Sequence, residues 1–107
     1  MEDDLAARFL PQFVALARSR VEIALEAVAR RDHGATQTTV RELHSLAGEA
    51  GLLGLHQVIP LARDGEQKAK RLHSSHADAD ADALADALRE LDHVIDDIAP
   101  APPRNGA

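Results

Sequence analysis

The sequence predicts an all-α fold: an antiparallel up-and-down four-helix bundle with a short extra helix at the N-terminus. Apolar residues recur at steps of three and four along most of the 107 residues, which is the period of a helix. Phe9 and Phe13 are the only aromatic residues, so the core must consist of Leu, Ile, Val and Ala, a composition typical of packed helices. Short polar connections separate the amphipathic segments, and the length suits one domain with a single core.

The first apolar segment covers residues 5–31 and contains a proline near its start. Proline is tolerated in the first turn of a helix but not in its interior. Pro11 therefore predicts a short helix over about 3–9, followed by a long helix over about 11–31. Residues 32–34, Asp-His-Gly, supply the turn chemistry that ends the long helix.

The next two predicted helices are joined by a glycine-containing turn. The second helix begins near Ala35 or Thr36 and ends at residues 51–54. The third is predicted over about 53–72, with Pro60 inside it. Because an interior proline removes one backbone donor and crowds a carbonyl, we expect a kink there at a cost of about 3 kcal/mol.

The last helix is predicted over about 78–98, although its first residues alternate Ala and Asp with a period of two. Ala and Asp are both depleted in strands, and carboxylates are favoured near the N-terminus of a helix. Apolar residues from Leu84 to Ile98 then follow at steps of four and three. Residues 1–99 are thus predicted to form the bundle, and the proline-rich residues 100–107 a flexible tail.

Charge and composition restrict the classes of partner and compartment. Twelve Lys and Arg against eighteen Asp and Glu give a net charge of -6, which argues against binding nucleic acid or an anionic membrane. No apolar run approaches the roughly 20 residues of a membrane span, and the N-terminal residues 1–4 are acidic, unlike a secretory signal. The chain has no cysteine, so we expect a cytoplasmic protein without disulfides or thiol chemistry.

The most informative segment lies on the second predicted helix, where His44 precedes Gly48, Gly51 and Gly54 at offsets of four, seven and ten. Each interior glycine destabilises a helix by about 1 kcal/mol relative to alanine, so this arrangement needs a reason. Positions i, i+3, i+4 and i+7 share one helical face, which would surround His44 with Ala47 and two glycines. A histidine on such a bare face is accessible to another protein's active site.

These residues, His-x-Leu-x-Gly-x-x-Gly-x-x-Gly-Leu over 44–55, resemble the histidine-containing phosphotransfer (HPt) domain of two-component phosphorelays. The similarity is closest to the N-terminal phosphoacceptor domain of chemotaxis-type histidine kinases. It implies that His44 carries a phosphoryl group between a histidine kinase and the aspartates of response-regulator receiver domains. It also implies a phosphocarrier that is no enzyme by itself and has no cofactor of its own, with Mg²⁺ supplied by the partner receiver domain.

The resemblance also implies a second site residue, because the family's glutamate twenty-two positions after the histidine falls on Glu66. A carboxylate that accepts from Nδ1–H fixes the tautomer in which Nε2 is nucleophilic. The family's usual lysine, three positions after the histidine, is Ala47 here. Arg63 is a candidate to replace this cation beside the phosphoryl group, and Lys70 is a further one.

A small apolar docking surface is predicted around the histidine, formed by Ala47, Gly48, Gly51 and Leu52. We expect a monomer, since His44 must remain exposed. Two other interpretations stay open: an adaptor or inhibitor that binds a kinase or receiver without being phosphorylated, and a structural bundle whose motif is coincidental. The loss of lysine at position 47 is the best support for the adaptor.

A metal site is not predicted. His73 and His76 are three residues apart, but no cysteine accompanies them and the surrounding sequence is a serine-rich turn.

Overall fold

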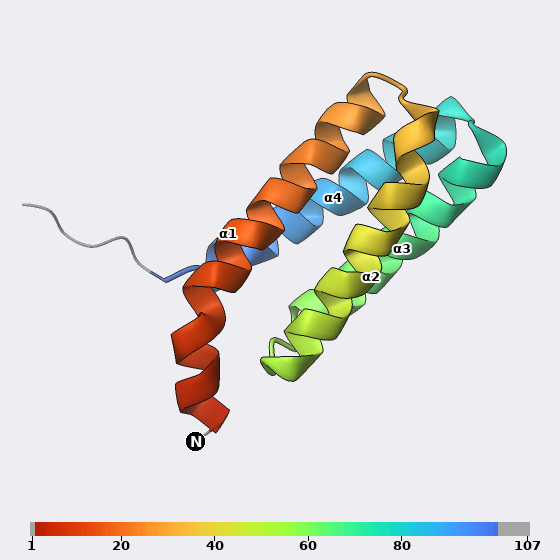
Figure 1. Cartoon of the computed structure of the whole chain (residues 1–107). Coiled ribbons are helices and arrows are strands. Elements are labelled where there is room, and N and C mark those ends of the chain that lie inside the picture. The colour runs from red at the N-terminus through yellow and green to blue at the C-terminus, as the bar shows by residue number, and fades with distance from the viewer. Residues whose placement is uncertain (1, 101–107) are drawn as a thin grey trace, which may run out of the picture.

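The computed structural model describes residues 2–100, with side chains from residue 6, and places them in a helical bundle (Figure 1). The helices are α1 (Glu2–Ala29), α2 (Thr36–Leu52), α3 (Val58–Ser75) and α4 (Asp78–Ile98), with a short 3-10 helix, η1 (His33–Ala35), before α2. No strand occurs among these residues, so the all-α prediction is confirmed for them. Figure 1 shows the chain turning back at each connection. Residues 101–107, nearly all of the predicted tail, lie outside the described residues.

The predicted separate helix over 3–9 is wrong, because α1 continues through Pro11 as one helix. An interior proline costs about 3 kcal/mol, but Val14, Ala17 and Val21 on the same helix are at most 4% exposed. Burial of one valine stabilises by about 1.5 to 3 kcal/mol, so the two buried valines together offset the proline. Figure 1 shows the N-terminal part of α1 inclined to the rest, as expected of a proline-containing helix.

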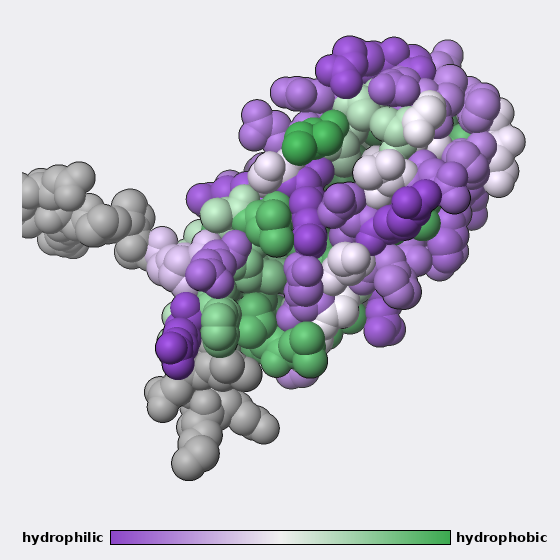
Figure 2. Space-filling model, viewed as in Figure 1, coloured by the Kyte–Doolittle hydropathy of each residue, from purple (hydrophilic) through white to green (hydrophobic). Residues whose placement is uncertain are grey.

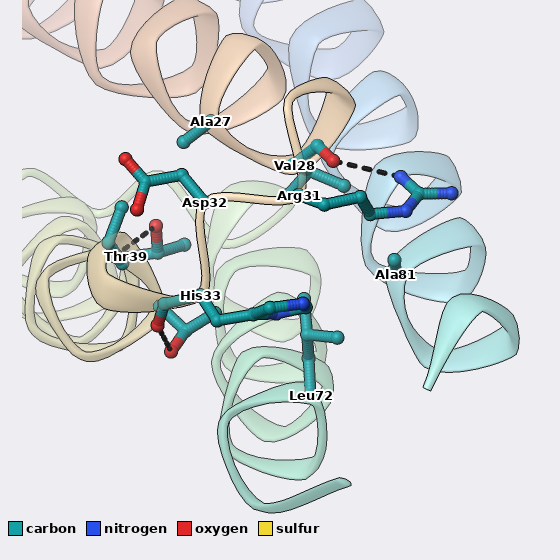
Figure 3. Close-up of a pocket in the computed structure, with 10 residues that line it drawn as sticks. Ala27, Val28, Arg31, Asp32, His33, Thr39, Leu72 and Ala81 are labelled. Carbon is teal, nitrogen blue, oxygen red and sulfur yellow. Dashed lines mark hydrogen bonds between the residues drawn. The ribbon is translucent and has the colours of Figure 1, made fainter. Parts of the chain in front are cut away.

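The C-terminus of α1 is formed by an arginine rather than by the glycine of residues 32–34. Arg31 adopts a left-handed conformation with φ 54°, and its N–H donates to Val28 O at 3.0 Å. The N–H of Asp32 donates to Ala27 O at 3.0 Å, which completes a Schellman motif. The Arg31 side chain reaches back to the same Val28 carbonyl, Nη1 to O 2.8 Å (Figure 3). This contact helps to hold a conformation that glycine would adopt without strain.

The turn after α2 does use glycine. Gly54 has φ +70°, its N–H donates to Gly51 O at 3.2 Å, and the N–H of Leu55 donates to Ala50 O at 2.9 Å. These two bonds are those of a Schellman motif, whose left-handed position strongly favours glycine.

Helix α3 begins at Val58, five residues later than predicted, and this removes the expected kink at Pro60. Pro60 is the third residue of the helix. The N–H groups of the first turn have no acceptor within the helix, so a proline there removes no internal hydrogen bond. The prediction of a kink was therefore wrong, whereas the predicted bounds of α4, 78–98, agree with the structure.

The core lies between all four helices and is built from aliphatic side chains and alanines, with Phe13 as its one aromatic member among the described residues. Leu46 on α2 and Leu84, Leu88 and Leu91 on α4 are at most 1% exposed. Four fully buried alanines allow the helices to approach closely: Ala17, Ala50, Ala62 and Ala69. Among the described side chains only three buried ones are polar, and Glu66 is the one that carries a charge.

The connections at one end of the bundle enclose a small hollow, drawn in Figure 3. The rings of His33 and His76 stack there, with centroids 4.2 Å apart and planes 6° apart. His73 Nδ1 lies 2.6 Å from Thr36 Oγ1. These three histidines join the connection before α2 to the end of α3, which gives them a structural explanation. None of the described helices is long and apolar enough to cross a membrane.

Candidate functional site

The candidate phosphoacceptor, His44, lies in the middle of α2 and points away from the core. Its side chain is 78% exposed, whereas its neighbours Leu43 and Leu46 are 3% and 1% exposed. The helical period produces this contrast, because it turns the two leucines inward and leaves the imidazole on the surface. Another protein can therefore reach the ring directly.

Glu66 on α3 contacts the ring from one side. Its Oε2 and Oε1 lie 3.2 Å and 3.3 Å from Nδ1 of His44, while only 11% of the Glu66 side chain is exposed. A carboxylate accepts and does not donate, so Nδ1–H is the donor in this pair. The neutral imidazole then has its lone pair on Nε2, the nitrogen directed away from Glu66.

Of the two candidate cations, the structure places Lys70 at the site. Lys70 Nζ lies 3.3 Å from Glu66 Oε2, one helical turn further along α3, and its side chain is 52% exposed. Arg63 is exposed, and its side chain makes no hydrogen bond or ion pair with any residue that the structure describes. His44, Glu66 and Lys70 therefore form a chain of contacts across α2 and α3, to which Arg63 does not belong.

Two of the three motif glycines leave open space beside His44. A Cβ atom added at Gly48 or Gly51 would meet nothing within 4 Å, and both residues are exposed. The bundle itself therefore does not require these glycines, in contrast to Gly54 with its left-handed φ. An approach by a second molecule would explain a face that lacks side chains.

A family model described as Hpt domain matches residues 8–99 of the chain. The chain belongs to the Hpt domain family. Hpt domains act in histidine phosphotransfer in two-component systems, where they are phosphocarriers that interact with histidine kinases and receiver domains. No curated protein and no solved structure matches the chain significantly.

Ala47 does not lie on the open face of this Hpt domain, contrary to the prediction. It is 6% exposed and packs in the core with Leu46 and Ala50. Although i and i+3 lie on one face of a helix, they differ by about 60° around its axis, which is enough to turn Ala47 inward. Leu52, also predicted for docking, is 83% exposed.

An apolar groove between α1 and the end of α2 was not predicted from the sequence. Phe9, Leu16 and Leu52 line it and are 40%, 48% and 83% exposed, together with Phe13 and Glu49. Figure 2 shows apolar surface gathered along the line between these two helices.

A sequence signal for this groove does exist. Phe9 and Leu16 are seven residues apart and both exposed, and Ile23 continues the same spacing along α1 beyond the groove. A separate stripe is buried, with Phe13 and Ala17 at 5% and 0% exposure. A helix with two apolar stripes buries one of them and presents the other to solvent or to a partner.

The described residues contain no group of three or more His, Cys, Asp or Glu side chains placed to hold a metal ion. His73 and His76, which were weighed as ligands, instead contact Thr36 and His33.

Proposed function

We propose that this Hpt domain is a phosphocarrier in a two-component phosphorelay and that His44 is the residue phosphorylated. One observation carries the proposal: the Glu66 carboxylate lies 3.2 Å from Nδ1 of an imidazole whose side chain is 78% exposed. Phosphoryl acceptance at Nε2 requires an accessible, unprotonated nitrogen, and a carboxylate on Nδ1–H favours that tautomer.

The proposed transfer begins with an acyl phosphate on a receiver aspartate. Nε2 of neutral His44 attacks the phosphorus atom, the N–P bond forms, and the P–O bond to the aspartate breaks. The aspartate leaves as a carboxylate, and the proton on Nδ1 stays in place. The ring thereby acquires a positive charge, which the adjacent Glu66 carboxylate stabilises, and transfer to a second receiver reverses the same steps.

Lys70 is the cation that we propose for this site in place of the lysine that Ala47 replaces. A cation on this chain would offset the negative charge that Glu66 places near the phosphoryl oxygens. Lys70 Nζ is 3.3 Å from Glu66 Oε2, and its half-exposed side chain has freedom to move toward the phosphoryl group. Because the contact is solvated, its contribution should be modest.

We propose that receiver domains dock over the open face of α2 and the adjoining groove. Gly48 and Gly51 leave room for the partner's active site, from which the Mg²⁺ would come. Leu52, at 83% exposure, lies on the same helix and lines the groove with Phe9 and Leu16. Exposed leucines and phenylalanines gathered in this way are typical of protein-binding surfaces. A monomer would leave both the histidine and the groove accessible.

A second candidate function is an adaptor that binds a kinase or receiver without accepting phosphoryl. Ala47 favours it, because this buried alanine stands where the family's usual lysine would lie beside the phosphoryl group. The adaptor would use the same docking surface but not the nucleophilicity of His44.

The decisive experiment incubates the protein with a ³²P-labelled, phosphorylated receiver domain. We expect a label on the chain that is labile in acid and stable in alkali, and we expect His44→Gln to lose it. His93→Gln is the matched control, because His93 is also an exposed histidine within a helix. A label that persists in His44→Gln contradicts the assignment of His44. Receiver binding without any labelling, unchanged in His44→Gln, would establish the adaptor instead.

A further inference from the structure

The residue before Glu66 is a buried glycine, and it contacts the residue before His44. A Cβ atom added at Gly65 would lie 3.2 Å from Cδ1 and 3.8 Å from Cδ2 of Leu43. Leu43 is 3% exposed and belongs to the core. One residue further along each helix, Glu66 lies 3.2 Å from His44. The two contacts are thus adjacent along the interface of α2 and α3.

Gly65 differs from the glycines of α2. At Gly48 and Gly51 an added Cβ meets nothing within 4 Å, whereas at Gly65 the nearest atom belongs to a side chain of the neighbouring helix. A contact of 3.2 Å is tighter than normal for a methyl group, so an alanine there would require Leu43 or the whole helix to shift.

We propose that Gly65 is a positioning residue for the phosphotransfer site. Because Gly65 has no side chain, Leu43 packs directly against the backbone of α3. This contact determines the distance between α2 and α3 at the place where His44 contacts Glu66. The inference rests on the proposed function of His44, but it concerns the spacing of the site rather than the identity of the phosphoacceptor.

The hydrogen-bond length makes the site sensitive to this spacing. The distances of 3.2 Å and 3.3 Å from Nδ1 to the Glu66 oxygens are already at the long end of the range for N–H···O bonds. A separation greater by a few tenths of an ångström would bring the pair near 3.5 Å, where little of the bond remains. Leu43 is 3% exposed and belongs to the core, and it also lines a hollow between α1 and α2, so a Leu43 side chain that moved into this hollow would leave the spacing of the helices unchanged.

The test compares the His44 ring signals of Gly65→Ala with those of Gly51→Ala, whereas the transfer rate of Gly65→Ala is compared with the wild type, because Gly51 lies on the proposed docking face. Both changes replace a helical glycine by alanine and so gain the same helix propensity, but only the first has a neighbour to displace. We expect Gly65→Ala to slow phosphoryl transfer from a phosphorylated receiver by roughly tenfold. The ¹⁵N signals of the His44 ring should move in Gly65→Ala toward their positions in Glu66→Gln and should stay in place in Gly51→Ala.

A compensating change separates positioning from general loss of structure. Leu43→Val shortens the side chain that the new methyl group meets, so the double variant Leu43→Val, Gly65→Ala should recover most of the rate and the ring signals. Unchanged rate and ring signals in Gly65→Ala would overturn the proposal, and so would a slow Gly65→Ala that Leu43→Val does not rescue. If Gly65→Ala itself fails to fold, the double variant provides the test. A double variant that folds but does not recover the ring signals contradicts the proposal.

Failure of this inference is distinguishable from failure of the proposed function. If the wild-type chain accepts no label, the phosphocarrier proposal fails, but the ring signals still report whether Gly65 positions Glu66 against His44. If the wild type is labelled and the Gly65→Ala signals are unchanged, only the positioning role fails.

Discussion

Glu66 contacts His44 across the interface of α2 and α3 with a carboxylate whose side chain is only 11% exposed. A buried charge is unfavourable unless it is paired, and Glu66 has two partners, His44 Nδ1 and Lys70 Nζ. Both partners are more than half exposed, so a buried carboxylate holds two side chains that a second protein can reach.

Glu66→Gln should slow phosphorylation of His44 by roughly tenfold without unfolding the chain. The amide keeps the size of the side chain but has no negative charge to stabilise the ring cation. Stopped-flow or gel-based transfer rates, with circular dichroism as the check on folding, give the answer. Equal rates for the variant and the wild type would remove Glu66 from the site.

Lys70→Met should slow transfer about threefold to tenfold, a modest effect because the ammonium group is half exposed. Lys68→Met is the control, since Lys68 lies on the same helix but pairs with Asp64. Lys70→Arg should retain most of the rate, because it keeps the charge. The assignment of Lys70 is refuted by identical rates in Lys70→Met and Lys68→Met, and a slow Arg63→Met would move the role to Arg63.

Gly48→Phe should lower the rate of phosphoryl transfer from a receiver domain by roughly tenfold or more and leave the fold intact. A Cβ atom at this position meets no neighbour within 4 Å, so a new side chain has room to project into the space above α2. Thermal unfolding should show no destabilisation, because replacing glycine within a helix gains about 0.5 kcal/mol. Labelling by phosphoramidate, a small donor, should continue at the normal rate. Loss of both reactions would mean that the substitution damages His44 itself.

Leu52→Ser should weaken binding of a receiver domain by about tenfold, because it removes the most exposed of the large apolar side chains that the structure describes. Its effect on the melting temperature should be small, since an 83% exposed leucine buries little surface. Ile23→Ser is the comparison: Ile23 is 63% exposed and lines a different hollow on α1. Titration calorimetry with each variant tests the pair, and equal weakening by both would place the docking surface elsewhere.

Arg20→Met should lower the free energy of unfolding by about 1 to 2 kcal/mol. Arg20 is 18% exposed and bridges α1 to α2 through Glu42 (Nε to Oε2 2.8 Å) and Glu49 (Nη1 to Oε1 2.8 Å). Arg89→Met is the control, since the Arg89–Asp86 pair is exposed and lies within a single helix. Urea denaturation measures both variants, and a loss no larger in Arg20→Met than in Arg89→Met would show that the bridge does not stabilise the bundle.

Periodicity sufficed for the helices whose ends carry strong local signals. The bounds of α4 follow from its acidic first turn and its leucine stripe, and the end of α2 follows from Gly54. One error came where tertiary packing outweighed a local rule. Pro11 did not divide α1, because that helix buries Val14, Ala17 and Val21, and no count of propensities includes that burial.

The candidate site, too, was predicted correctly in some residues and wrongly in others. The pairing of His44 with Glu66 was anticipated from a family offset, and the distance between them agrees with it. The burial of Ala47 was missed, because an offset of three places a residue only approximately on a face. Lys70 and Arg63 both lie one turn from Glu66 on α3, four residues after it and three residues before it, and the structure places Lys70 Nζ, but no Arg63 atom, in an ion pair with the carboxylate.

The position of Arg20 has a consequence for the groove between α1 and α2. His44 and Glu66 belong to α2 and α3, which are joined by residues 53–57, so the pair can assemble from one hairpin. Phe9 and Leu16, by contrast, line the groove only while α1 is packed against α2. The ion pair of Arg20 with Glu49 helps to hold α1 in this position. Local opening of α1 would therefore remove Phe9 and Leu16 from the groove, whereas His44 and Glu66 would remain on the same α2–α3 hairpin.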